Sequence, residues 1–106
     1  MEGKVLAFKV QFVSNSLQKG HAEYLVKVIS THGHTFHIRD RYKLMRNFWD
    51  ALRRTVRNPN RIPDFPPKKW LGNMNQDFIV QRQGELEYFF TTLLDEPEFA
   101  KHQMVL

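Results

Sequence analysis

The sequence contains no cysteine and no apolar run near the roughly 18 residues that a membrane-spanning helix needs. Without cysteine, disulfide frameworks, thiolate metal sites and cysteine nucleophiles are excluded, which suits a reducing compartment such as the cytosol. The start of the chain carries lysines within its apolar run and lacks the cleavage pattern of a secretory signal. We therefore expect one cytosolic domain, and 106 residues with 42% hydrophobic side chains suffice for its core.

Signatures of catalysis and of metal binding are also absent. The sequence has no G-x-S-x-G, HExxH or P-loop motif. His32, His34 and His37 form H-x-H-x-x-H, but a strand would turn His34 and His37 to opposite faces, and no carboxylate stands close by. We therefore expect no enzyme, no metal site and no cofactor.

Positive charge is concentrated in the middle of the chain. The net charge is +5, but residues 39–69 hold ten Lys and Arg against three Asp and Glu. Residues 1–38 are nearly balanced, and residues 70–106 are acidic. A field concentrated in this way favours an acidic partner, either a lipid surface or a nucleic acid, although a basic face can also serve solubility alone.

The first part of the chain alternates apolar and polar residues at the period of a β-strand. Leu6, Phe8, Val10 and Phe12 form one such series and residues 22–28 another. The polar segment 14–21 between them predicts a hairpin connection. A turn at residues 32–34 leads into a third strand over residues 35–39, so an antiparallel three-stranded β-meander is expected.

The period then changes to that of an amphipathic helix. The apolar stripe consists of Met45, Phe48, Trp49, Leu52 and Val56, and most basic residues lie off it. This helix should end near residue 58, because four prolines follow in residues 59–67. A proline-rich loop therefore joins this helix to the next one.

A second long helix follows the loop. Asn73 or Asn75 can cap it, and its apolar positions are Ile79, Leu86, Phe89, Phe90 and Leu93. A short last helix should open near Pro97, anchored by Phe99. The expected fold is α+β, a three-stranded antiparallel β-meander packed against a helical subdomain, with the proline-rich loop between the two main helices.

Two arginines are candidates for binding an anion. Arg82 stands at or beside the buried stripe of the second helix, where a guanidinium needs an anion close by. That anion is either a ligand or an internal carboxylate, such as the carboxylates of Glu85, Asp50 or Asp64. An arginine at the junction Ile38-Arg39-Asp40-Arg41-Tyr42, where the third strand meets the first helix, is suited to a phosphate, and Tyr42 offers a flat face to a sugar or inositol ring.

The loop Pro66-Pro67-Lys68-Lys69-Trp70-Leu71-Gly72 is the third candidate element. Its lysines could hold a phosphate while Trp70 and Leu71 dip into the interfacial region of a membrane. The alternative is that Trp70 packs against the helices of its own domain.

These elements together resemble the phox-homology (PX) domain family. Its pattern is three strands, an Arg-Tyr junction, a Pro-Pro-x-Lys loop and a helix with Phe-Ile-x-x-Arg and a following leucine. The matching stretches, in family order, are HIRDRYKLMRNFWDAL, IPDFPPKKWLGN and DFIVQRQGELEYFFTTLL. The resemblance covers essentially the whole chain, residues 1–106, as a single PX-like domain that we expect to be excised from a larger, sorting nexin-like trafficking, signalling or cytoskeletal protein.

The resemblance implies phosphoinositide binding, with phosphatidylinositol 3-phosphate on endosomal membranes as the expected lipid. It implies that Arg41 holds the 3-phosphate and Tyr42 lies under the inositol ring. Lys68 would meet the 1-phosphate, and Arg82 the 4- and 5-hydroxyls. Trp70 and Leu71 would insert into the membrane.

This sequence departs from the family pattern at two positions near the key arginine. Asp40 replaces a basic residue that usually precedes Arg41, and Lys43 replaces a frequent serine after Tyr42. An acid there could weaken binding, and Lys43 could favour a more highly phosphorylated head group. Lys43 and Lys69 are therefore possible additional lipid contacts, and Lys69 competes with Lys68 for the 1-phosphate.

Two further partner classes are alternatives, a protein partner and a nucleic acid, and of these a nucleic acid is not expected. The basic helix, with Arg46, Arg53, Arg54 and Arg57, could track nucleic-acid phosphates, which predicts binding that is steep in salt and indifferent to lipid. Residues 63–68 fit P-x-x-P-x-K, a ligand pattern for Src-homology-3 domains, although the prolines could also be rigid spacers that shape the lipid loop. The oligomeric state is not predicted. Single-lipid affinity should be modest, so strong recruitment would need a second signal.

Overall fold

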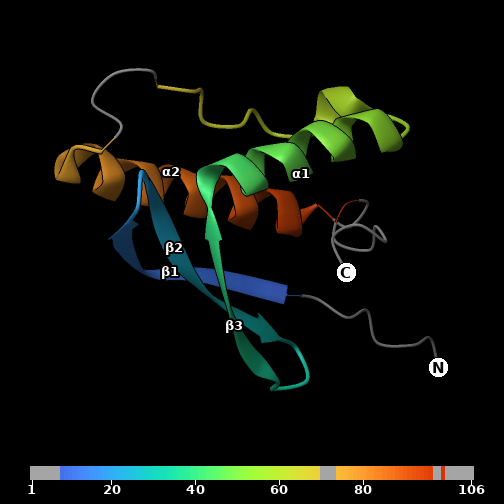
Figure 1. The fold of residues 1–106 in the computed structure, drawn as a ribbon. Coiled ribbons are helices and arrows are strands. Elements are labelled where there is room, and N and C mark those ends of the chain that lie inside the picture. Colours follow the sequence, from blue (N-terminus) through green and yellow to red (C-terminus); the bar gives the residue numbers. More distant parts are fainter. Residues whose placement is uncertain (1–7, 70–73, 97–98, 100–106) are drawn as a thin grey trace.

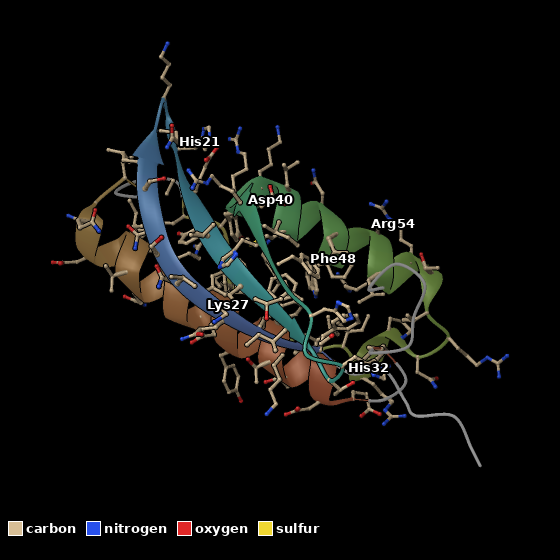
Figure 2. The ribbon with its side chains drawn as sticks, turned by 90° about the horizontal axis from the view of Figure 1, so that it is seen from below. His21, Lys27, His32, Asp40, Phe48 and Arg54 are labelled. Carbon is tan, nitrogen blue, oxygen red and sulfur yellow. The ribbon has the colours of Figure 1, made fainter. Side chains whose placement is uncertain are left out.

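The chain forms a three-stranded sheet followed by two long helices that cover one face of it (Figure 1). The computed structural model describes residues 8–69, 74–96 and 99. The elements in chain order are β1 (Phe8–Gln18), β2 (His21–Ser30), β3 (Thr35–Arg41), α1 (Tyr42–Thr55), the short 3-10 helix η1 (Pro59–Arg61) and α2 (Gln76–Asp95). Figure 2, seen from below, has the sheet in front of both helices. The predicted α+β meander is confirmed.

The sheet is an antiparallel meander in the order β1-β2-β3. The connection between β1 and β2 is shorter than predicted, because residues 14–18 continue β1 and only Lys19 and Gly20 make the turn. Gly20 has φ 76°, a left-handed conformation that glycine adopts without a steric cost. A β-bulge between Phe12 and Ser14 shifts the register there, so the period of two breaks at Val13. β3 also runs to Arg41, two residues beyond its predicted end.

The first helix follows its predicted stripe. Met45 and Leu52 are buried, and the other stripe residues pack against the core. The helix ends at Thr55, three residues before the predicted limit, and the Val56 amide still donates to the Leu52 carbonyl. The loop after it returns across the helices, and its Phe65 ring lies within 6 Å of the rings of Tyr42, Trp49 and Phe89. Phe65 therefore fixes the proline-rich loop to both main helices.

The second helix is capped by Asn75, one of the two predicted candidates. Its side-chain oxygen accepts hydrogen bonds from the amides of Asp77 and Phe78. The buried face of α2 carries the predicted apolar residues together with Arg82. Phe99, the predicted anchor of the last helix, is fully buried, while most of that predicted helix lies outside the described residues.

Two hollows flank the strand β3 where it joins α1. An apolar groove of about 380 Å³ lies between the sheet and the helices, with Phe36, Ile38 and Leu44 half-exposed on its lining. The other hollow is a cleft of about 440 Å³ whose lining is rich in basic side chains. In the described part of the chain, no helix is long and apolar enough to cross a membrane, and no three His, Asp or Glu side chains gather as metal ligands.

Candidate functional site

The basic cleft brings together residues from four separate parts of the chain. Its walls come from the β1–β2 turn, the start of α1, the end of the proline-rich loop and the start of α2. All six predicted binding residues that fall within the described ranges line it, namely Arg41, Tyr42, Lys43, Lys68, Lys69 and Arg82. The predicted insertion residues Trp70 and Leu71 lie outside the described residues.

Arg82 is almost fully buried, with 4% of its surface exposed. Its Nη2 donates a hydrogen bond of 2.6 Å to the Pro67 carbonyl, and its guanidinium lies between two rings, 4.0 Å from the centroid of Tyr42 and 4.6 Å from that of Phe78. These contacts connect α2 to α1 and to the loop that carries Lys68. Arg82 is therefore a structural contact of the cleft as well as a candidate ligand.

The charge of Arg82 is only partly balanced inside the domain. Its Nε lies 3.7 Å from Oε1 of Glu85, the ion pair that was one predicted alternative. That separation is too long for a hydrogen bond, and Nε has no hydrogen-bond partner among the described residues. Among the residues that the structure describes, neither Asp50 nor Asp64 pairs with it. A buried guanidinium N–H without an acceptor is costly, so the Glu85 carboxylate offsets the burial of Arg82 only in part.

Tyr42 is held in place at its hydroxyl group and at its ring. Its Oη donates to the Pro66 carbonyl at 2.6 Å and accepts from Nη1 of Arg46 at 3.1 Å. The ring contacts Phe65, with 5.4 Å between centroids, and the guanidinium of Arg82. These contacts fix the orientation of the Tyr42 ring in the wall of the cleft.

Arg41 is the N-cap residue of α1, and its side chain is available for a ligand. The α1 N-terminus has no side-chain cap and no acidic residue in its first turn; the nearby acid Asp40 precedes the N-cap and accepts from the Arg41 amide. The guanidinium of Arg41 makes no hydrogen bond or ion pair with another described residue. The cleft thus combines a half-buried arginine with an uncapped helix start, both suited to a phosphate.

Asp40, the acidic departure from the expected pattern, lies in the other hollow. Neighbouring residues of a strand face opposite sides, and Asp40 lines the apolar groove while Arg41 lines the basic cleft. One carboxylate oxygen of Asp40 accepts a 2.9 Å hydrogen bond from the Arg41 amide. The acid therefore supports the backbone at the junction and does not line the cleft.

Comparison with known proteins gives the family. The family model described as PX domain matches residues 28–106. The chain belongs to the PX domain family. A solved structure titled "X-ray structure of a designed CISK-PX domain" superposes with a TM-score of 0.78 at 24% sequence identity, over 92% of this chain and 93% of that chain, which establishes the shared fold. No curated protein matches the chain significantly.

PX domains are phosphoinositide-binding modules that associate with membranes peripherally and have no catalytic activity of their own. The family thus supports the general function predicted from the sequence. The match begins within β2 and includes the α1 junction, the proline-rich loop and α2, which carry the candidate residues.

The cleft of this PX domain also contains residues that the sequence analysis did not assign to it. Arg46, Asn47 and Asp50 line it from α1, and His21 lines it from the start of β2. With Lys43, the α1 residues are spaced i, i+3, i+4 and i+7, the spacing of one helix face. This spacing can be read from the sequence. That this face of α1 lines a cleft could not, because the cleft depends on where the proline-rich loop lies.

Basic residues dominate the lining of the PX cleft. Six Lys and Arg side chains line it against a single described carboxylate, that of Asp50. Lys69 lies with Nζ 4.7 Å from the centroid of the Phe78 ring.

At the cleft's buried wall, desolvation raises the pKa of Tyr24, an effect that the nearby Arg82 opposes, so this hydroxyl stays neutral at physiological pH. The cleft therefore favours anions over a wide range of pH.

Proposed function

We propose that this PX domain recruits its parent protein to membranes by binding phosphoinositides that carry a 3-phosphate. Phosphatidylinositol 3-phosphate is the smallest ligand of this class, and its presence on endosomal membranes makes these the proposed location. The observation that carries the proposal is the convergence of Arg41, Lys68 and Arg82 on one cleft. Three cations there suit a head group with one phosphodiester and one phosphomonoester.

Each residue has a proposed role. Arg41 binds the 3-phosphate, helped by the uncapped start of α1. Lys68 binds the 1-phosphate at the loop wall, and Arg82 donates to the ring hydroxyls with N–H groups that the Pro67 carbonyl does not use. Tyr42 supports the ring from below. Lys69 and Lys43 add positive charge on either side of this set.

Membrane insertion is the second part of the proposal. Trp70 and Leu71 directly follow Lys69, which lines the cleft, so the predicted insertion residues adjoin the head-group site in the chain. Tryptophan favours the interfacial depth of a bilayer, and each basic residue near an anionic leaflet adds about 1 kcal/mol. Shallow insertion and head-group binding would therefore act together, with modest affinity from a single lipid.

The proline-rich segment has a different proposed role, that of a rigid strut inside the domain. Phe65 and Pro66 are buried, and the carbonyls of Pro63, Pro66 and Pro67 accept hydrogen bonds from Trp49, Tyr42 and Arg82, respectively. A Src-homology-3 domain would have to break these contacts to bind residues 63–68 as an extended ligand. We therefore favour the spacer interpretation over a Src-homology-3 partner.

Vesicle co-sedimentation against a panel of phosphoinositides tests the proposed function. The panel contains phosphatidylinositol, each monophosphate and each bisphosphate in a neutral carrier lipid at physiological salt. We expect the 3-phosphorylated lipids to bind, and Arg41→Gln to weaken them at least about tenfold. Arg54→Gln is the matched control, since it removes the same charge from α1 outside the cleft. Equal loss in both variants, or binding that ignores the head group, would favour nonspecific or nucleic-acid binding by α1.

A further inference from the structure

One wall of the cleft is left without a role by the proposed contacts. Lys43, Arg46, Asn47 and Asp50 share one face of α1 and all line the cleft. None of the four has been assigned a direct contact with a 1-phosphate, a 3-phosphate or the ring hydroxyls. The two basic residues of this set, Lys43 and Arg46, are therefore available to bind a further anion.

The internal contacts of this wall leave its positive charge unbalanced. Arg46 uses Nη1 for the Tyr42 hydroxyl and lies 5.3 Å from the centroid of the Trp49 ring, contacts that do not neutralise it. Lys69, on the loop across the cleft, rests over Phe78. None of Lys43, Arg46 and Lys69 forms an ion pair with a carboxylate in the part of the chain that the structure describes. Lys43 is exposed, and it has no hydrogen bond there either.

The charges of the cleft can be matched against those of a head group. Arg41, Lys68 and Arg82 supply at most three positive charges, since Glu85 partly balances Arg82, and a head group with a 1-phosphodiester and a 3-phosphomonoester carries about −2.5 to −3. The remaining Lys43, Arg46 and Lys69, less Asp50, leave a surplus of two positive charges. A second phosphomonoester carries about −1.5 to −2 at pH 7, which matches that surplus.

We infer that Lys43 and Arg46 of α1, with Lys69 opposite them, form a second phosphate subsite for a head group that carries another phosphomonoester beside the 3-phosphate. The inference rests on the proposed function, because the same head group must occupy the Arg41 site. Asp50, at the far end of this α1 face, weakens the subsite. Phosphatidylinositol 3-phosphate is then a ligand that leaves the subsite unfilled, and a 3,4- or 3,5-bisphosphate fills it.

Isothermal titration calorimetry with soluble head groups tests the subsite without a membrane, so neighbouring acidic lipids contribute nothing. The probes are inositol 1,3-bisphosphate, inositol 1,3,4-trisphosphate and inositol 1,3,5-trisphosphate at physiological salt. We expect at least one trisphosphate to bind about tenfold more tightly than the bisphosphate, the gain that one charge-assisted contact provides.

The variants separate the subsite from the 3-phosphate site. Lys43→Gln should lower the affinity for the trisphosphate by a much larger factor than the affinity for inositol 1,3-bisphosphate, so that the advantage of the trisphosphate is lost. Asp50→Asn should strengthen trisphosphate binding. Arg54→Gln, which removes a charge from the same helix outside the cleft, should leave both affinities unchanged. Figure 2 shows Arg54 well along α1 from the end near His21, which lines the cleft.

The possible failures are distinguishable. If inositol 1,3-bisphosphate binds and Arg41→Gln abolishes that binding, but the trisphosphates gain nothing or keep their gain in Lys43→Gln, the subsite is refuted and the proposed function stands. If acidic vesicles with phosphatidylinositol 3-phosphate require Lys43 while the soluble trisphosphates show no gain, the lysine binds neighbouring lipids and the subsite is again refuted. If no head group and no vesicle binds, the proposed function itself fails.

Discussion

The guanidinium of Arg82 lies 4.0 Å from the centroid of the Tyr42 ring, so α1 and α2 meet in one wall of the cleft. The Tyr42 hydroxyl and Arg82 also bond the consecutive carbonyls of Pro66 and Pro67. These two residues therefore position Lys68, the next residue of the loop, relative to Arg41. The head-group site depends on this contact, because its ligands come from segments far apart in the sequence.

The first prediction separates Arg82 from Arg41 by their effects on stability. Arg82→Leu leaves the Pro67 carbonyl without its donor and removes contacts with two rings, so the free energy of unfolding should fall by about 1–3 kcal/mol. Arg41→Gln breaks no contact of its side chain with the described residues, so stability should change by less than about 0.5 kcal/mol. Urea denaturation followed by circular dichroism measures both, and equal losses would contradict the assignment.

The second prediction concerns Asp40. Its carboxylate faces the apolar groove and accepts a hydrogen bond from the Arg41 amide, and asparagine retains such an oxygen. Asp40→Asn should therefore leave the affinity for a 3-phosphorylated head group within about twofold of the native value. Asp50→Asn is the contrasting variant, because Asp50 lines the cleft. A large gain of affinity in Asp40→Asn would mean that this acid reaches the head group.

The third prediction concerns the proline-rich loop. A free peptide of residues 60–70 should bind a Src-homology-3 domain more tightly than the folded PX domain does, because the folded domain buries Phe65 and Pro66 and engages the loop carbonyls. Fluorescence anisotropy with a labelled peptide, and competition by the folded domain, measures the difference. Strong competition by the folded domain would show that the segment is accessible as a ligand.

The fourth prediction concerns the alkaline stability of the domain. Burial raises the pKa of Tyr24 in the folded state, with Arg82 opposing and Glu85 reinforcing the rise. The unfolded chain then loses the Tyr24 proton first, at a pH of about 10, so the unfolding free energy falls as pH rises from there through the folded-state pKa. Tyr24→Phe should reduce this fall relative to the native chain. An identical decline in both proteins, measured by urea denaturation between pH 8 and 11, would contradict it.

Much of the fold could be predicted because its signals are local. Residues three or four positions apart define the apolar stripes of α1 and α2, and the Asn75 cap likewise depends on neighbouring residues. The length of β1 could not be predicted in this way, because Ser14, Asn15 and Ser16 have the composition of a loop. They continue the strand beyond a bulge and pair with β2, and Asn15 also bonds Gln83 of α2. Such tertiary partners override the local preference.

In the candidate site, too, features with local signals could be predicted from the sequence, and features that depend on tertiary packing could not. Arg82 could be proposed from its place on a buried helical stripe, whereas the position of Asp40 on the opposite face from Arg41 became clear only because β3 runs to Arg41, two residues beyond its predicted end. The role of the face that carries Lys43, Arg46 and Asp50 could not be predicted, because it faces a cleft only where the proline-rich loop forms the other wall. The position of the loop depends on the packing of Phe65 against α1 and α2. This packing has no periodic signal in the sequence.

The central claim is that the basic cleft is the head-group site, and an NMR titration with inositol 1,3-bisphosphate tests it most directly. The account predicts shift changes for the backbone amides of Arg41, Tyr42 and Lys68 and for the side-chain Nε–H of Arg82, which has no hydrogen-bond acceptor in the part of the chain that the structure describes. The amides of Phe36 and Ile38, whose side chains line the apolar groove, should stay unchanged. Changes confined to the groove, or to residues 53–57 of the basic helix and the turn after it, would contradict the account.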